Sequence, residues 1–157
     1  MERSSIQQAN PPEARESAMW RAILNGFLKG APPSVMRVVR RRVAAAPIEE
    51  FLIVGRRSGA EHRLLLGLFE VDGRWYAGHP NGDAQWVRNL VAAGGCTVIR
   101  RDGVPVQVTA REVVDPEERE AVIQRTGTQP APAGLIYRGA RQHIRAVGRF
   151  FRLVPMT

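Results

Sequence analysis

Two spacings of hydrophobic residues divide the chain into a helical N-terminal part and a strand-rich remainder. Residues 1–16 are polar and show no hydrophobic period, so we expect a disordered tail. The apolar residues that follow recur at i, i+3, i+4, i+7 and i+8, which gathers them on one helical face: Trp20, Ile23, Leu24, Phe27 and Leu28. Gly30 and Pro32-Pro33 end this predicted helix.

A second, basic helix is predicted from Ser34, a good N-cap residue, to Ala46. Its narrow apolar stripe of valines is surrounded by arginines: Arg37, Arg40, Arg41 and Arg42. Such a segment could lie on an anionic membrane or face nucleic acid, although most basic helical faces are simply solvated. No aromatic residues are interleaved with the arginines as base stacking requires, so we expect no nucleic-acid partner.

From Glu50 onward the pattern is typical of strands. The predicted strands are Phe51–Val54, Leu64–Val71, Arg74–Gly78, Cys96–Arg101, Val104–Val114 and a closing strand Phe150–Val154. Asp72-Gly73 and Asp102-Gly103 are hairpin signals. The run that starts at Leu64 is apolar without alternation, so we expect both of its faces to be covered by helices or a second subunit. Apolar and polar residues alternate along the strand from Val104, so one of its faces should be exposed to solvent.

Three helices are predicted among these strands. Asp83 is expected to cap a helix that carries Trp86, Leu90 and Val91, and Gly94-Gly95 ends it. Pro116 opens the next helix at a favourable first-turn position. After a loop over Gly127–Gly134, a helix is expected over Tyr137–Ala146. Helices followed by antiparallel hairpins predict one α+β domain over 17–157, with N-terminal helices over 17–46 and a small barrel.

The composition of the chain is strongly basic. Lys and Arg total 23 against 15 Asp and Glu, which gives a net charge of +8. A cationic surface attracts nucleic acid, anionic lipid or a polyanionic small molecule, and charge alone does not choose among them. Lys29 is the one lysine of the sequence, so genomic base composition is an equally good explanation of the arginines.

The compartment is predicted from what the sequence lacks. Cys96 is the single cysteine, so nothing requires an oxidising environment. No apolar run approaches the roughly 20 residues that span a bilayer, and no secretion signal is recognisable. We therefore expect a cytoplasmic protein, with at most a weak peripheral association with the inner membrane face through Ser34–Ala46.

The most informative segment is the turn Gly55-Arg56-Arg57-Ser58-Gly59, which follows an apolar strand directly. It offers two guanidinium groups, a hydroxyl and glycine-exposed backbone N–H groups, a set that can hold a phosphate or a carboxylate. The loop Gly78-His79-Pro80-Asn81-Gly82 precedes a predicted helix, whose N-terminal N–H groups are also available to anions. The sequence therefore predicts an anion site.

The order of these features resembles the deazaflavin-dependent nitroreductase family of actinobacterial type. The motifs that carry the resemblance are the Gly55–Gly59 turn, the Gly78–Gly82 loop and Trp86-Val-Arg-Asn89-Leu90, and it spans roughly Phe51 to Val114. Members are split β-barrels, like FMN-binding proteins, that bind coenzyme F-420, whose tail carries a phosphate and several glutamate carboxylates. The resemblance implies an oxidoreductase that transfers a hydride to a hydrophobic acceptor, such as a quinone, a nitroaromatic or an activated alkene.

The resemblance also assigns roles to residues of this chain. The cofactor-binding residues that it implies are Arg56, Arg57 and Ser58 at the tail, Gly78, His79, Asn81 and Gly82 along the rings, and Trp86 and Asn89 as supports. Where the family has an arginine three residues after its Ser-Gly pair, this chain has His62 and then Arg63, and either would take that place. Tyr137 is the candidate to contact the acceptor or donate a proton, although a tyrosine that merely covers the barrel is the more frequent case.

Other chemistry finds little support in the sequence. The three histidines are far apart and no ligand spacing stands out, so we predict no metal site. Ser58 has no partner motif for acyl transfer. A non-catalytic split barrel that binds FMN, haem or a fatty acid remains the alternative, because the His62–Leu65 stretch departs from the family pattern. We expect a monomer or a homodimer.

Overall fold

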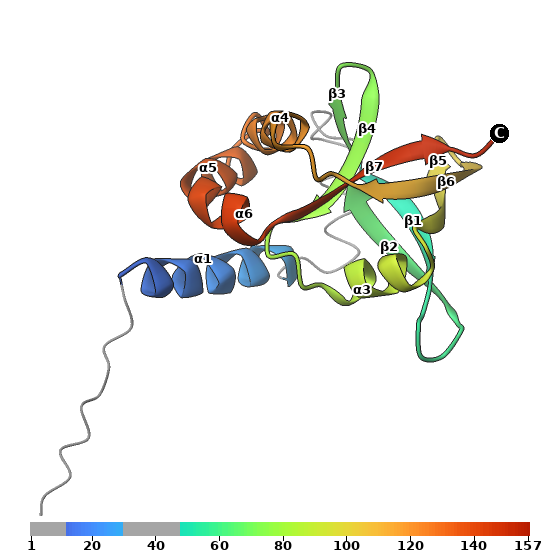
Figure 1. Ribbon diagram of the computed structural model, residues 1–157, viewed down its shortest axis with the longest axis horizontal. Coiled ribbons are helices and arrows are strands. Elements are labelled where there is room, and N and C mark those ends of the chain that lie inside the picture. The colour runs from blue at the N-terminus through green and yellow to red at the C-terminus, as the bar shows by residue number, and fades with distance from the viewer. Residues whose placement is uncertain (1–11, 30–47) are drawn as a thin grey trace, which may run out of the picture.

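The computed structural model describes residues 12–29 and 48–157 (Figure 1). The helices are α1 (Pro12–Lys29), α3 (Gln85–Ala92), α4 (Pro116–Thr126), α5 (Ala133–Gly139) and α6 (Arg141–Val147). The strands are β1 (Ile48–Val54), β2 (Glu61–Gly67), β3 (Phe69–Val71), β4 (Arg74–His79), β5 (Cys96–Arg101), β6 (Val104–Glu112) and β7 (Arg149–Pro155). The predicted basic helix Ser34–Ala46 lies outside the described residues. Helix α1 begins at Pro12, so the end of the predicted tail 1–16 is helical.

The described strands form one antiparallel sheet in the order β2-β1-β5-β6-β7-β4-β3. Its two edge strands, β2 and β3, are consecutive in the chain, and a single residue, Leu68, separates them. The sheet must therefore curl until its edges approach, which makes the half-closed barrel visible in Figure 1. Leu68 is 1% exposed at this corner. The predicted α+β split-barrel class is confirmed.

The same corner corrects one prediction. The predicted strand Leu64–Val71 is two strands, because β2 pairs with β1 while β3 pairs with β4 at the other edge of the sheet. The leucines of β2 are only half-buried, since β2 is an edge strand, so the expected cover on both faces is not seen among the described residues. The prediction failed because barrel closure is a global property, and Leu68 carries no local turn signal.

Local turn chemistry predicted the hairpins correctly. Asp72 and Gly73 have φ of 50° and 72°, and Asp102 and Gly103 have φ of 49° and 82°, the left-handed pair that a tight two-residue hairpin requires. The expected solvent-exposed face of β6 is confirmed, since Val108 and Ala110 on one face are buried while Gln107 and Arg111 on the opposite face are exposed.

The helix predictions were partly wrong at the ends. Asp83 does not cap α3: the N-cap residue is Ala84, without a side-chain bond, and the Asp83 carboxylate pairs with Arg21 of α1 instead. Helix α4 begins at Pro116 as predicted, with the Asp115 side chain accepting from the Glu118 N–H at 2.8 Å. The helix predicted over Tyr137–Ala146 is two short helices, α5 and α6, which meet at Ala140.

Two clusters of buried residues cover the two sides of the sheet. The first lies inside the barrel and includes Phe51, Leu68 and Phe151, together with Trp86 and Leu90 of α3. The second joins the outer side of β3, β4 and β7 to α1, α4, α5 and α6: Leu24, Phe69, Tyr76, Val113, Val122, Ile123, Ala140, Ile144 and Phe150. Ile23, expected on the buried face of the first helix, is 40% exposed. Figure 1 shows α3 beneath β1 and β2, apart from the helices at the other end.

Candidate cofactor-binding site

The turn between β1 and β2 is closed by its own backbone. The Gly55 N–H donates to the Ala60 carbonyl at 2.8 Å, and the Gly59 N–H donates to the Gly55 carbonyl at 2.9 Å. Gly59 has φ of +68°, which a glycine adopts without strain. A Cβ at Gly55 would lie 2.6 Å from His62 Nε2 and 2.9 Å from Ser58 Oγ, so these two side chains fold over the Gly55 backbone.

Helix α3 holds this turn through Arg56. The Arg56 guanidinium donates from Nη1 to Asn89 Oδ1 at 2.8 Å and to Gln85 Oε1 at 3.0 Å. The Arg56 backbone N–H also donates to Asn89 Oδ1, at 3.3 Å. Gln85 and Asn89 are four residues apart, so both amides lie on one face of α3. Arg56 and Asn89, which the sequence analysis assigns separately to the cofactor tail and to the support of the site, are thus in direct contact.

The charge of Arg56 is fixed in place without being neutralised. Both of its side-chain partners are uncharged amides, and the described residues offer Arg56 no carboxylate. Three further arginines are exposed nearby: Arg57 in the turn, Arg63 on β2 and Arg88 on α3. None of the three has an acidic partner in the described part of the chain. The guanidinium groups therefore keep the charge and the free N–H donors that an oxyanion needs.

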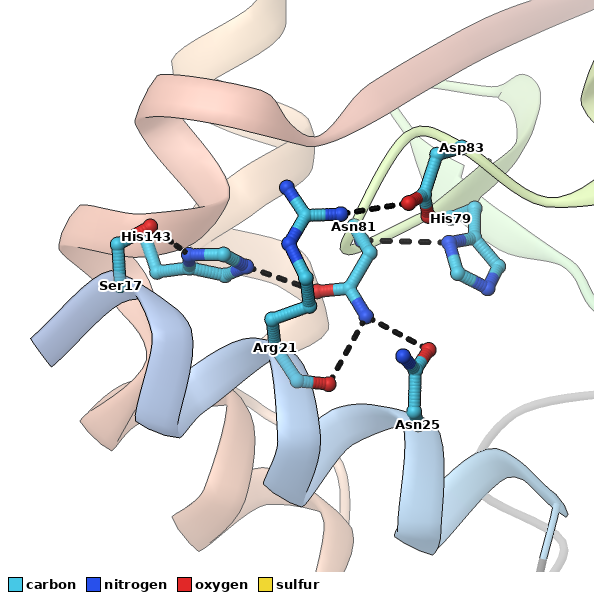
Figure 2. A network of polar contacts seen from close by, with 7 residues as sticks. All are labelled: Ser17, Arg21, Asn25, His79, Asn81, Asp83 and His143. Atoms are coloured by element: carbon cyan, nitrogen blue, oxygen red, sulfur yellow. Dashed lines mark hydrogen bonds and ion pairs between the residues drawn. The ribbon is translucent and has the colours of Figure 1, made fainter. Parts of the chain in front are cut away.

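The second predicted element, the Gly78–Gly82 loop, is anchored by a polar network (Figure 2). Asn81, only 2% exposed, donates from Nδ2 to the Arg21 carbonyl at 3.2 Å and to Asn25 Oδ1 at 2.8 Å, both on α1. Its Oδ1 lies 2.7 Å from Nε2 of His143 on α6, and His143 Nδ1 lies 2.9 Å from Ser17 Oγ on α1. The Asn81 side chain therefore joins three segments of the fold.

This network fixes the tautomer of His143. Because the Asn81 amide nitrogen donates to two oxygens, its Oδ1 must accept, so His143 carries its proton on Nε2. Nδ1 then accepts from the Ser17 hydroxyl. Burial lowers the pKa of His143, and the nearby Arg21 guanidinium lowers it further, against an opposing effect of Asp83. The ring is therefore neutral near pH 7.

The His79 ring stands at the edge of the same network. Its Nδ1 accepts from the Asn81 backbone N–H at 3.2 Å, and its ring meets Trp86 of α3 edge-on, with centroids 6.4 Å apart. Burial is the main cause that lowers the pKa of His79; Asp83 raises it and Arg21 lowers it. His79 thus connects the loop to the first turn of α3, the helix that also holds Arg56.

The two glycines of the loop serve close packing. A Cβ at Gly78 would collide with the Phe150 ring, and one at Gly82 would collide with the Val147 carbonyl oxygen. Gly82 also has φ of +70°, a left-handed conformation. The loop can therefore lie against β7 and the end of α6 only with glycine at both positions.

The structure does not bring Tyr137 to these residues. Tyr137 is half-buried on α5 beside the second cluster, and burial raises its pKa to about 12. Figure 1 places α5 at the opposite end of the molecule from the β1–β2 turn. The proposed contact of Tyr137 with an acceptor stays a prediction that the geometry does not support.

Several residues of the site were missed in the sequence. Gln85 could have been found, because it lies one helical turn before Asn89 on the same face. Ser17, Arg21, Asn25 and His143 carried no local signal, since their contacts join segments distant in the chain. Among the described residues, no group of three His, Cys, Asp or Glu side chains is arranged to hold a metal ion.

The curled sheet with α3 laid beneath β1 defines the protein as a split barrel, and solved structures share this fold at low identity. One, described as a domain-swapped dimer, matches with a TM-score of 0.50 and 18% identity over 87% of this chain and 98% of its own. An F-420-H2-dependent reductase (FDR-A) matches with a TM-score of 0.47 and 17% identity over 68% and 93%. A conserved hypothetical protein from Mycobacterium tuberculosis matches with a TM-score of 0.47 and 15% identity over 70% and 73%. The resemblance expected from the motifs is confirmed at the level of the fold.

Sequence comparisons add no family. No family model matches the chain, and no curated protein matches it. In the segments that the structure describes, no helix is both long and apolar enough to cross a membrane.

Proposed function

We propose that this protein is an oxidoreductase that binds coenzyme F-420 and passes a hydride from its reduced form to a hydrophobic acceptor. The observation that carries the proposal is the arrangement of Arg56, a cation that the amides of Gln85 and Asn89 order and that has no carboxylate partner among the residues the structure describes. Ordering a cation without neutralising it is useful where an anion is to be bound. The order of the motifs along the chain and the split-barrel fold support the same assignment.

The donor set of the turn fits the anionic tail of this coenzyme. Arg56 offers its remaining N–H groups to a phosphate, while the exposed Arg57 and Arg63 extend the cationic surface towards further carboxylates. Ser58 Oγ accepts from the Ala60 N–H at 3.2 Å, so its hydroxyl proton remains available to an anion.

The coenzyme supplies the hydride when it is bound, and the protein supplies position and environment. Arg56 and its neighbours orient the tail, and α3 fixes the distance from this turn to the Gly78–Gly82 loop. Trp86 lies beside Phe151 in the first buried cluster, with ring centroids 6.3 Å apart, and these two rings would give the ring end of the site an apolar wall. We identify no nucleophile among these residues, and hydride transfer requires none.

The proposal is tested by turnover. Purified protein is mixed with reduced F-420 and menadione, and reoxidation of the coenzyme is followed by its absorbance, with reduced FMN as the matched alternative donor. We expect oxidation with F-420 that depends on protein concentration, and little with FMN. Binding of FMN, haem or a fatty acid without any turnover of F-420 would favour the non-catalytic split barrel instead.

A further inference from the structure

One side-chain donor beside α3 is held in position and left unused. His79 Nδ1 accepts from the Asn81 backbone N–H at 3.2 Å, so a neutral ring must carry its proton on Nε2. That Nε2 has no hydrogen-bond partner among the described residues, and it is not among the buried atoms without a partner, so it remains accessible. Figure 2 shows it pointing away from Asn81 and from the rest of the network.

Three contacts keep this donor in one orientation. The Asn81 backbone holds Nδ1, and the Trp86 ring meets the imidazole edge-on. Asn81 is itself fixed through its side chain by His143 and Asn25. Because burial keeps His79 uncharged near pH 7, it offers a neutral N–H donor rather than a cation. A donor of this kind suits a ring carbonyl or a ring nitrogen.

Helix α3 places this donor next to the cationic turn. Trp86, which touches His79, and Asn89, which holds Arg56, are three residues apart and therefore neighbours on the helix surface. The rise between them along the helix axis is about 4.5 Å. One ligand that carries a planar ring and an anionic tail can reach both places.

We propose that His79 Nε2–H donates a hydrogen bond to a carbonyl oxygen or ring nitrogen of the bound cofactor ring, while Arg56 binds its tail. The inference rests on the proposed function, and it adds the ring contact and the direction of the cofactor along α3. His79 is the residue in contact with the ligand; Asn81 and His143 are positioning residues that act through it.

Two variants of His79 separate hydrogen bonding from packing. In His79→Asn the shorter amide keeps an acceptor near Nδ1 for the Asn81 N–H but no longer reaches the Nε2 position. In His79→Gln the longer amide returns an N–H donor to the Nε2 position. Unfolding in urea checks that both variants keep the fold.

Two probes separate the ring contact from the tail contact. Dissociation constants are measured by fluorescence for F-420 and for its tail-less deazaflavin riboside. We expect His79→Asn to weaken both probes about five- to tenfold, as the loss of one hydrogen bond does. His79→Gln should stay within about threefold of wild type, and Arg56→Ala should weaken F-420 alone.

Each outcome decides between the claims. If wild type binds F-420 and His79→Asn binds it equally well, the ring contact is wrong while the proposed function stands. If His79→Gln is as weak as His79→Asn, the imidazole serves packing and the proposal is also wrong. If wild type binds neither probe, the proposed function and this inference fail together. Should the riboside bind too weakly for wild type to be measured, F-420 alone decides in the same way.

Discussion

Asn89 Oδ1 accepts two hydrogen bonds from Arg56, one from the guanidinium at 2.8 Å and one from the backbone N–H at 3.3 Å. An acceptor shared in this way orients both the main chain and the side chain of the turn. Since Asn89 is neutral, the Arg56 charge stays available to a ligand.

The first prediction follows from this neutrality. Asn89→Asp keeps an acceptor oxygen in the same place but adds a negative charge beside Arg56. We expect the dissociation constant for F-420 to rise about fivefold, since two unit charges a few ångströms apart in water interact by about 1 kcal/mol. Fluorescence titration measures the change. Affinity equal to that of wild type would show that the tail lies elsewhere.

The second prediction concerns the stability that Asn81 provides. Asn81→Ala leaves the buried His143 Nε2–H without its acceptor, which we expect to lower the free energy of unfolding by about 1–3 kcal/mol. Asn25→Ala is the matched control: Asn25 is less buried, and its removal costs Asn81 one of two acceptors. Urea unfolding measures both variants, and an equal loss would contradict the central role of Asn81.

The third prediction is a pH dependence of stability. The pKa of His143 is lowered in the folded protein, so the unfolded chain binds the proton more tightly, with a pKa of about 6.5. The stabilisation is fully present above about pH 6.5 and is lost as pH falls towards the folded pKa, with a slope of at most about 1.4 kcal/mol per pH unit for one proton. The pKa of His79 is also lowered, so His79 changes the free energy of unfolding with pH in the same direction.

His143→Gln tests this pH dependence, because the Gln amide can still donate to Asn81 but does not titrate. Its free energy of unfolding should fall less than that of wild type between about pH 7 and pH 5. Glu112 and Glu120 do not affect stability between pH 7 and pH 5. Their pKa values are lowered by Arg149 and Arg145, so their contribution to the free energy of unfolding is lost only below about pH 4.5. Identical slopes for variant and wild type would refute the assignment.

The fourth prediction concerns Tyr137. Burial raises its pKa to about 12, and α5 lies away from the β1–β2 turn (Figure 1). We therefore expect Tyr137→Phe to keep the turnover rate with reduced F-420 and menadione within about twofold of wild type, since it removes a hydroxyl with no role in the chemistry. A loss of tenfold or more in kcat would restore Tyr137 as a proton donor.

Features that depend on local chemistry could be predicted from the sequence. The hairpins at Asp72-Gly73 and Asp102-Gly103 need a left-handed backbone, and few residues provide it. The start of α4 at Pro116 follows from Asp115 and the proline themselves. The resemblance placed Arg56 and Asn89 in one candidate site, but it predicted neither their direct contact nor the part played by Gln85.

Features that depend on tertiary packing could not be predicted from the sequence. Asp83 has the chemistry of a helix cap, yet its carboxylate pairs with Arg21, 62 residues earlier in the chain. The His143–Asn81 contact also spans 62 residues, and nothing near either position announces it. The break at Leu68 exists because the sheet closes on itself, which no short window of sequence can show.

The central claim is that the Gly55–Gly59 turn binds the anionic tail of F-420 through Arg56. The most direct test compares the dissociation constant for F-420 of wild type, Arg56→Ala and Arg15→Ala. Arg15 is exposed near the start of α1, and Figure 1 shows that end of α1 at the other side of the molecule from the β1–β2 turn. Its loss therefore removes the same unit charge without touching the turn. The account predicts that Arg56→Ala weakens binding tenfold or more and that Arg15→Ala binds like wild type, because a charge-assisted hydrogen bond is worth about 1.5–3 kcal/mol. Equal binding by Arg56→Ala and wild type would contradict it.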